Sequence, residues 1–139
     1  MNITSKGRYA LRVMLDLAQH RDEAYVSLKA VSERQGLSMK YVESIVANMK
    51  KAELLDSARG KEGGYRLSRD PKDYSIGEIL REIEDNLAPV SCIKAGSIAC
   101  EHAGECMTVP MWKELDDITN AYLNQVTLED LLTGKRWKS

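Results

Sequence analysis

The sequence predicts a mainly α-helical protein with one short β-hairpin and a long helix near the C-terminus. Three observations predict this class. Apolar residues recur every three or four positions in several segments, Ser or Thr precedes most of these segments, and one glycine-rich turn separates two short apolar runs. The 139 residues are 43% hydrophobic and 29% charged, which is typical of a globular domain and excludes a disordered or collagen-like chain.

The first three predicted helices lie in the N-terminal third of the chain. The first runs from about Ser5 to Gln19, and its apolar face consists of Tyr9, Ala10, Val13, Met14, Leu17 and Ala18. Ser27 is the expected N-cap of the second helix, which ends at Gly36, a residue suited to a left-handed C-terminal position. Ser38 is the N-cap of the third, whose apolar side consists of Tyr41, Val42, Ile45, Val46 and Met49.

The tight turn between the second and third helices is typical of a helix-turn-helix. In that motif the helix after the turn enters the major groove of DNA. An ordinary pair of antiparallel helices has the same local pattern, so the turn alone leaves both interpretations open.

A short β-hairpin follows the third helix. Leu54–Ala58 and Tyr65–Leu67 are the predicted strands, and residues 59–64 form a glycine-rich turn with two cations, Arg59 and Lys61. A hairpin in this position is the wing of a winged helix-turn-helix domain, and it can reach a neighbouring groove or the DNA backbone. A plain hairpin loop is the alternative. A nucleotide-binding phosphate loop is excluded, since no helix follows the glycines.

Three further helices are predicted. Ser75 caps a fourth helix, with Ile76, Ile79, Leu80 and Ile83 facing inward. No periodicity is found from Leu87 to Glu105. A long helix runs from about Thr108 to Asn124 with Pro110 in its first turn, and Thr127 caps a last short helix that ends at Gly134.

The long helix has an apolar seam that suggests a dimer. Met111, Leu115, Ile118 and Tyr122 recur at spacings of four, three and four, while Trp112 and Leu123 widen the stripe. We expect a second copy of the chain to cover it. Packing against its own domain is the alternative.

Charge is distributed unevenly along the chain. Residues 1–69 contain 13 Lys and Arg against 8 Asp and Glu, a balance of +5, whereas residues 70–139 contain 7 against 13, a balance of −6. The basic first half therefore suits a polyanion such as DNA. The N-terminal residues have Lys6, Arg8 and Arg12 without a long apolar stretch, so we expect no signal peptide and a cytoplasmic location.

Three cysteines form a candidate metal site in the aperiodic segment. Cys92, Cys100 and Cys106 are separated by seven and five residues, and His102 lies between the last two. Structural disulfides are disfavoured in a reducing compartment. Clustered thiolates suit an iron–sulfur cluster, while zinc and free thiols are the alternatives.

These motifs together resemble the winged-helix regulators of the IscR, NsrR, RirA and CymR superfamily, in particular its iron–sulfur-binding branch. The matching segments span nearly the whole chain: Thr4–Ala10, Ser32–Ser38, Arg59–Gly60, Gly63–Tyr65, Ile76–Ile79, the three cysteines, Trp112 and Thr127–Leu131.

The resemblance implies a homodimer on double-stranded operator DNA. The implied DNA-binding residues lie on the third helix and the wing, where Glu43 is placed at base edges and Arg59 in the minor groove: Ser38, Lys40, Tyr41, Glu43, Ser44, Arg59, Gly60 and Lys61. The implied dimer contacts are Met111, Trp112, Leu115, Ile118 and Tyr122. It divides the chain into a DNA-binding domain (1–86), a cofactor segment (87–107) and a dimerisation part (108–139).

The resemblance also implies an iron–sulfur cluster on Cys92, Cys100 and Cys106, either 2Fe-2S or 4Fe-4S. The histidine that IscR has three residues after the third cysteine is Val109 here, and Arg8 and Arg12 stand on the first helix, where relatives use an acidic residue or a histidine. Glu101, His102 and Glu105 are the candidates for the fourth ligand. We expect a labile cluster that aerobic handling removes.

The predicted function is a sequence-specific transcriptional regulator that senses redox state, nitric oxide or iron–sulfur status. The alternative is a winged-helix regulator whose cysteines hold zinc or remain free, controlled by a partner protein or a small metabolite. A small iron–sulfur electron carrier or enzyme explains neither the wing nor the basic half. The sequence contains no evident nucleophile–base pair or dinucleotide fingerprint, so we expect no enzymatic activity.

Overall fold

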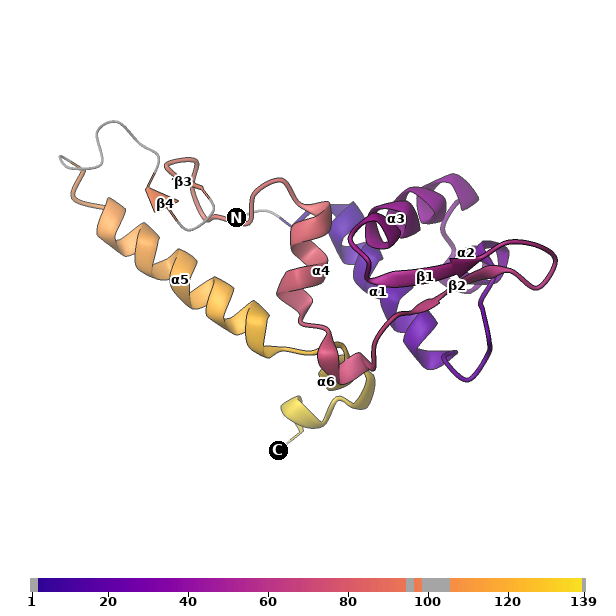
Figure 1. Ribbon diagram of the computed structural model, residues 1–139. Coiled ribbons are helices and arrows are strands. Elements are labelled where there is room, and N and C mark those ends of the chain that lie inside the picture. Colours follow the sequence, from indigo (N-terminus) through magenta and orange to yellow (C-terminus); the bar gives the residue numbers. More distant parts are fainter. Residues whose placement is uncertain (1–2, 95–96, 99–105, 139) are drawn as a thin grey trace.

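The computed structural model describes residues 3–94, 97–98 and 106–138. Its elements follow one another as shown in Figure 1. In chain order they are α1 (Ser5–Gln19), α2 (Leu28–Gln35), α3 (Met39–Lys51), β1 (Leu55–Ala58), β2 (Gly64–Leu67), η1 (Pro71–Asp73), α4 (Ile76–Ile83), β3 (Ile93–Lys94), β4 (Ser97–Ile98), α5 (Val109–Gln125), α6 (Leu128–Thr133) and η2 (Lys135–Trp137).

The helix boundaries follow from local capping chemistry. The hydroxyls of Ser27, Ser38, Ser75 and Thr127 each accept a hydrogen bond from the backbone N–H three residues later, at 3.0–3.1 Å. Each bond satisfies an N–H group that the first helical turn leaves unpaired. All four predicted caps are therefore confirmed. Thr108 precedes α5 as predicted, but its side chain makes no capping bond.

The core lies between α1, α3 and α4, and α6 packs against α1 and η1. Its largest fully buried side chains are Met14, Leu17, Ile45, Met49, Leu54, Leu55, Tyr74, Ile79 and Leu128. The amphipathic faces predicted for the first, third and fourth helices supply most of these residues. The sequence prediction of a mainly helical fold with a hairpin wing is confirmed.

The wing is an antiparallel hairpin attached to the segment before α2. Leu55 of β1 pairs with Leu67 of β2, and Ala58 pairs with Gly64. Val26 and Tyr65 exchange two backbone hydrogen bonds of 2.9 and 2.8 Å. Gly64 adopts a φ of +151°, and a Cβ atom there would lie 2.1 Å from the Val26 carbonyl oxygen, so only glycine allows this close attachment.

The α5 helix extends away from the helical domain as an arm (Figure 1). The chain then returns, because the Ile76 N–H donates to the Val126 carbonyl at 2.8 Å and the Leu128 N–H donates to the Tyr74 carbonyl at 3.0 Å. The C-terminal α6 thus joins the same core as α1. Within the described residues, no helix is long and apolar enough to cross a membrane.

The structure differs from the sequence prediction in the segment before α5. We expected no regular structure from Leu87 to Glu105, but Ile93 pairs with Ile98 in a small antiparallel hairpin. Strands of two residues are too short to produce an alternating pattern, which explains why this expectation was wrong. The Ile93 side chain is fully buried and anchors this segment.

Candidate DNA interface and cysteine segment

The turn between α2 and α3 is closed by its own backbone. Gly36 has a φ of +66°, in the left-handed region that favours glycine, and the Leu37 N–H donates to the Ser32 carbonyl at 3.1 Å. The Ser32 hydroxyl donates back to the Leu37 carbonyl. Leu37, the residue after Gly36 in the turn, is half-buried against the core. These contacts fix the angle at which α3 leaves the turn.

The first helix holds this turn through a buried carboxylate. Asp16 accepts two hydrogen bonds from the Arg34 guanidinium, at 3.0 and 2.7 Å, and a third from the Gln35 amide at 2.9 Å. Arg12 of α1 donates to the Gln35 side chain at 3.1 Å and to its carbonyl at 2.6 Å. The residues that end α2 are therefore tied to α1 by paired, charge-assisted bonds.

The same contacts determine the ionisation of Asp16. Burial raises the pKa of this carboxyl, but the hydrogen bonds from Arg34 and Gln35, together with the charges of Arg34 and His20, outweigh burial and lower it below the ordinary value. The Asp16 carboxylate also raises the pKa of Arg34 through their hydrogen bonds. At neutral pH this pair is fully charged.

The α3 helix buries one face and exposes the other. Val42, Ile45, Val46 and Met49 are buried, whereas Lys40, Glu43 and Ser44 are exposed on the opposite side. Residues 40, 43 and 44 lie three and four positions apart and so share one face. Ser38 is exposed but its hydroxyl caps the helix. Tyr41 is half-buried, with its ring edge-on to Tyr9 at 5.7 Å between centroids.

The turn of the wing has free cations. Arg59, Gly60 and Lys61 are all exposed, and within the described part of the chain neither Arg59 nor Lys61 makes a hydrogen bond or an ion pair. By contrast, Arg66 on β2 stacks over the Tyr25 ring at 4.7 Å. Figure 1 shows the wing turn at the end of the molecule opposite α5. The predicted DNA-binding residues therefore occupy two neighbouring elements of one domain, distant from the arm.

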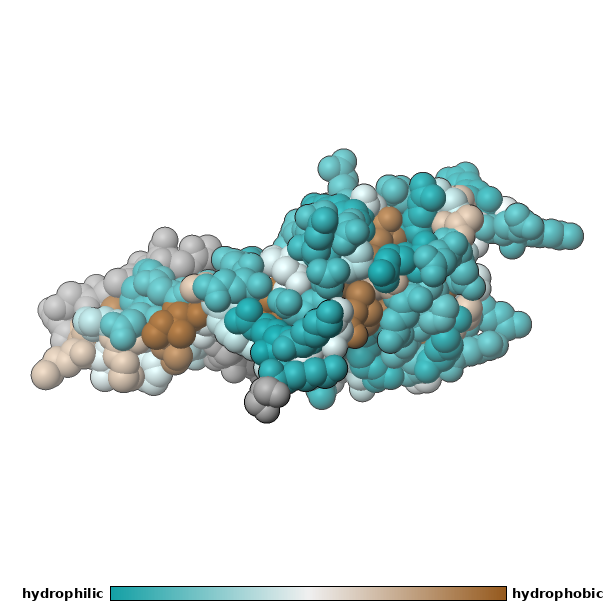
Figure 2. Space-filling model, turned by 90° about the horizontal axis from the view of Figure 1, so that it is seen from below, coloured by the Kyte–Doolittle hydropathy of each residue, from teal (hydrophilic) through white to brown (hydrophobic). Residues whose placement is uncertain are grey.

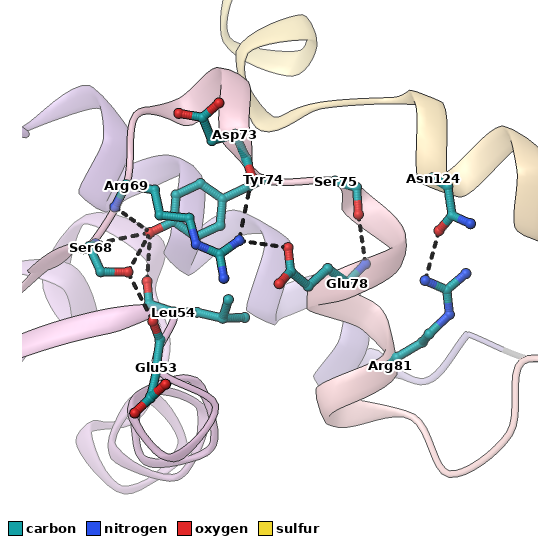
Figure 3. A network of polar contacts seen from close by, with 10 residues as sticks. All are labelled: Glu53, Leu54, Ser68, Arg69, Asp73, Tyr74, Ser75, Glu78, Arg81 and Asn124. Carbon is teal, nitrogen blue, oxygen red and sulfur yellow. Dashed lines mark hydrogen bonds and ion pairs between the residues drawn. The ribbon is translucent and has the colours of Figure 1, made fainter.

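A buried tyrosine holds the base of the wing. The Tyr74 hydroxyl donates to the Leu54 carbonyl at 2.6 Å and accepts from the backbone N–H groups of Ser68 and Arg69 at 2.9 and 3.1 Å (Figure 3). Arg69 covers the Tyr74 ring and donates to Glu78 of α4 at 2.9 Å. The Tyr74 hydroxyl thus joins the start of β1 to the end of β2, and Arg69 links them to α4.

The predicted dimer seam on α5 is exposed. The exposed fractions of Met111, Leu115, Ile118 and Tyr122 are 54, 39, 58 and 47%. In Figure 2, brown atoms lie over this arm, whereas the domain at the other end is mostly hydrophilic. Trp112 is half-buried, and Leu123 packs against the core rather than extending the seam. Large apolar side chains in one exposed row mark an interaction surface.

Two of the three predicted cysteine ligands lie in the described residues. Cys92 is half-buried just before β3, and Cys106 is exposed two residues before the cap of α5. Hydrogen bonds from the Thr108 side chain and from the backbone N–H groups of Thr108 and Val109 lower the pKa of the Cys106 thiol. Cys100, Glu101, His102 and Glu105 lie outside the described residues.

Sequence reasoning missed three residues that hold the candidate interface together: Arg12, Asp16 and Tyr74. For Asp16 a signal existed, because a carboxylate interrupts the apolar face formed by Val13, Met14 and Leu17. No local pattern identifies Tyr74, since its three partners belong to other elements.

Comparisons with known proteins agree with this architecture. The Rrf2 family, described as "Iron-dependent Transcriptional regulator", matches residues 3–134. The HTH-type transcriptional regulator IscR of Pectobacterium atrosepticum is 36% identical over 135 residues, which cover 97% of this chain and 81% of the relative. Two solved structures are similar: IscR of T. potens has a TM-score of 0.75, 36% identity and coverage of 97% and 88%. CymR, the global cysteine regulator of B. subtilis, has a TM-score of 0.78, 33% identity and coverage of 96% and 97%.

Proposed function

The chain belongs to the Rrf2 family of transcriptional regulators, a non-enzymatic family, and we propose that it binds operator DNA through α3 and the wing. The observation that carries this proposal is the pair of wing cations without a partner among the described residues, Arg59 and Lys61, on the same domain as the exposed polar face of α3. A free guanidinium is attracted to a narrow, electronegative minor groove or to phosphates.

The polar face of α3 supplies the base contacts in this proposal. Glu43 repels phosphates unless it accepts a hydrogen bond from a base, and the N4 amine of cytosine in the major groove is such a donor. Lys40 and Ser44 on the same face, with Ser38 and Gly60 at the two edges, position the backbone of the duplex. Tyr41 acts through Tyr9, because their ring contact fixes α3 on α1.

Duplexes selected from a random library with the wild-type protein provide the test. Arg59→Ala should weaken binding to the selected duplexes and reduce the slope of log affinity against log salt by about 1. Glu43→Ala should instead relax the base preference at one operator position. Lys72→Ala, which removes an exposed cation from η1, is the matched control and should change neither property.

In the proposed docking, substitutions at Arg59 and at Glu43 have different effects on DNA binding. Loss of affinity for every sequence identifies a backbone contact, while a change confined to one base identifies a base contact. If Glu43→Ala retains both wild-type affinity and wild-type base preference at every position, α3 does not read the major groove as proposed.

We further propose that the chain functions as a homodimer through α5. Met111, Leu115, Ile118 and Tyr122 form an exposed apolar row, and Trp112 borders it. A two-fold dimer brings the same row of each chain together and places two winged domains on paired half-sites.

The cysteine segment is the proposed sensor. Cys92, Cys100 and Cys106 would hold an iron–sulfur cluster. The exposed Cys106 sulfur, whose lowered pKa favours the thiolate, fits this ligand chemistry. Glu101, His102 and Glu105 remain the candidates for a fourth ligand. When bound, the cluster supplies redox and nitric oxide reactivity. The chain connects the cysteines directly to α5, so changes there are passed to the dimer arm.

Anaerobic reconstitution distinguishes the cluster from its alternatives. The wild-type protein should show visible charge-transfer absorption with iron and sulfide bound, and Cys106→Ala should abolish this absorption. A protein that remains colourless and binds one zinc per chain would contradict the cluster and favour the regulator without one. The DNA-binding test above is independent of this outcome.

A further inference from the structure

A cavity lies between α4 and the second half of α5. Its volume is about 490 Å³, and its walls include Arg81 of α4, Glu84 just after α4, and Asp116, Asn120 and Asn124 of α5. This volume lies in the range of small-molecule sites, roughly 300–1,000 Å³. Neither the proposed DNA-contacting residues nor the described cysteines are among the residues that line it.

Asp116 is the unexplained group in this cavity. Only 2% of the residue is exposed, yet its carboxylate forms no hydrogen bond or ion pair with any described residue. The other two carboxylates that are buried in the described part of the chain are both satisfied: Asp16 by Arg34 and Gln35, and Glu84 by the backbone N–H and the hydroxyl of Thr4, at 2.9 and 2.8 Å. A buried charge without a partner is costly and rare. The contrast therefore indicates a missing cationic partner.

Arg81 is the complementary group on the opposite wall. It reaches from α4 to α5, donating to the Asn124 side-chain oxygen at 2.7 Å (Figure 3) and to that of Asn120 at 3.1 Å. These two amides orient the guanidinium but leave its positive charge unpaired, and the remaining N–H groups can still donate. No ion pair within 4.0 Å joins Arg81 to Asp116 or to another described carboxylate.

We propose that this cavity binds a free α-amino acid, whose ammonium group pairs with Asp116 and whose carboxylate pairs with Arg81. A zwitterion pairs with both groups, whereas an amine pairs only with Asp116, and an anion pairs only with Arg81, which is exposed to solvent. A metal ion is disfavoured, because the described residues contain no group of three His, Cys, Asp or Glu side chains that could hold one. The guanidinium and carboxylate form a fork-shaped, charge-assisted contact.

The test uses the full-length protein without DNA and without a reconstituted cluster. Each of the twenty protein amino acids is added in a thermal-unfolding assay, and those that raise Tm are titrated by calorimetry. We expect at least one to bind saturably. Its decarboxylated amine and its deaminated carboxylic acid should each bind at least about tenfold more weakly, because each lacks one charged contact.

Two variants and one control locate the ligand. Asp116→Asn and Arg81→Gln should each raise the dissociation constant at least about tenfold. Asp116→Asn should retain or raise the Tm of the ligand-free protein, since it removes an unpaired buried charge, so loss of binding is not confused with unfolding. Asp117→Asn, on the exposed side of the same helix, should bind like the wild type.

Three results would overturn the proposal. One is the absence of a saturable effect from any of the twenty amino acids. Another is wild-type affinity in Asp116→Asn. The third is a decarboxylated amine that binds as tightly as its parent amino acid and keeps that affinity in Arg81→Gln, which would make the cavity a site for simple amines.

Discussion

The winged domain and the α5 arm differ in how much of their apolar surface is covered. Seven of the fifteen residues of α1 are buried, whereas only Val109 and Asp116 are buried among the seventeen residues of α5. The helices of the domain enclose a shared core, while the arm leaves a row of large apolar side chains exposed. The domain is therefore stabilised by its own chain, and the arm is suited to a partner.

The two regions also differ in their polar contacts. In the domain, the carboxylate of Asp16 and the hydroxyl of Tyr74 each make three hydrogen bonds of 3.1 Å or less. Along the arm, Asp116 has no described partner, and the pair between Lys113 and Asp117 is exposed. Substitutions in the domain should therefore change folding, while substitutions on the arm should change assembly. Four predictions test this distinction.

The largest effect should come from Leu115→Asp. The substitution places a charge in the exposed seam, and two-fold symmetry places it in the interface twice, so the dissociation constant of the dimer should rise more than about a hundredfold. Sedimentation velocity would show monomers. Asp117→Lys is the control, since two residues correspond to about 200° around the helix. An intact Leu115→Asp dimer would place the interface elsewhere.

The next effect should come from Arg34→Ala. It leaves the buried Asp16 carboxylate without its bidentate partner, which should lower the free energy of unfolding by about 2–3 kcal/mol. This is less than for a fully buried pair, because the Arg34 side chain is 35% exposed. Urea denaturation measures it. On the arm, Lys113→Ala breaks an exposed ion pair and should cost at most about 0.5 kcal/mol.

Two tyrosines allow a comparison with the same chemical change. Tyr74→Phe removes the hydroxyl that serves three backbone groups, and should destabilise the protein by about 1–3 kcal/mol. Tyr122→Phe on the exposed seam should change the free energy of unfolding by less than about 0.5 kcal/mol. Equal effects of the two substitutions in urea denaturation would contradict the proposed difference between domain and arm.

Much of the fold could be predicted from the sequence because its signals are local. Ser27, Ser38, Ser75 and Thr127 cap helices through contacts three residues away, and Gly36 ends α2 through its own backbone angle. Such features depend on neighbours along the chain. The apolar faces of α1 and α3 were predicted for the same reason, because a helical repeat depends on the sequence alone.

The remaining features depend on contacts between distant segments. The partners of Tyr74 are five to twenty residues away, and those of Asp16 are separated from it by a loop and most of a helix. The cavity beside Asp116 exists only once α5 lies next to α4. The apolar seam of α5 is also narrower than predicted, because Leu123 packs against the core. Sequence patterns identify which face of a helix is apolar but not which polar group that face will bury.

The smallest expected effect is a change in pH dependence that reports on Asp16. In the wild type its folded-state pKa is lower than the unfolded value, so the unfolded chain binds more protons in the acidic range and stability rises with pH. This contribution is fully present above the unfolded pKa of about 3.8 and is lost as the pH falls through the folded-state value.

In Arg34→Ala the strongest hydrogen bonds to Asp16 are gone, while burial, which raises its pKa, remains. Gln35 and His20 still lower the pKa, so the contribution of Asp16 should shrink and stability should rise less steeply with pH. Urea denaturation at several pH values between about 3 and 7 measures both slopes. Asp16→Asn removes the titrating carboxyl, so this position should make no contribution to the pH dependence of stability. If Arg34→Ala retained the wild-type slope, the Arg34 contact would not be what keeps Asp16 charged, and the domain would not owe its stability to that pair.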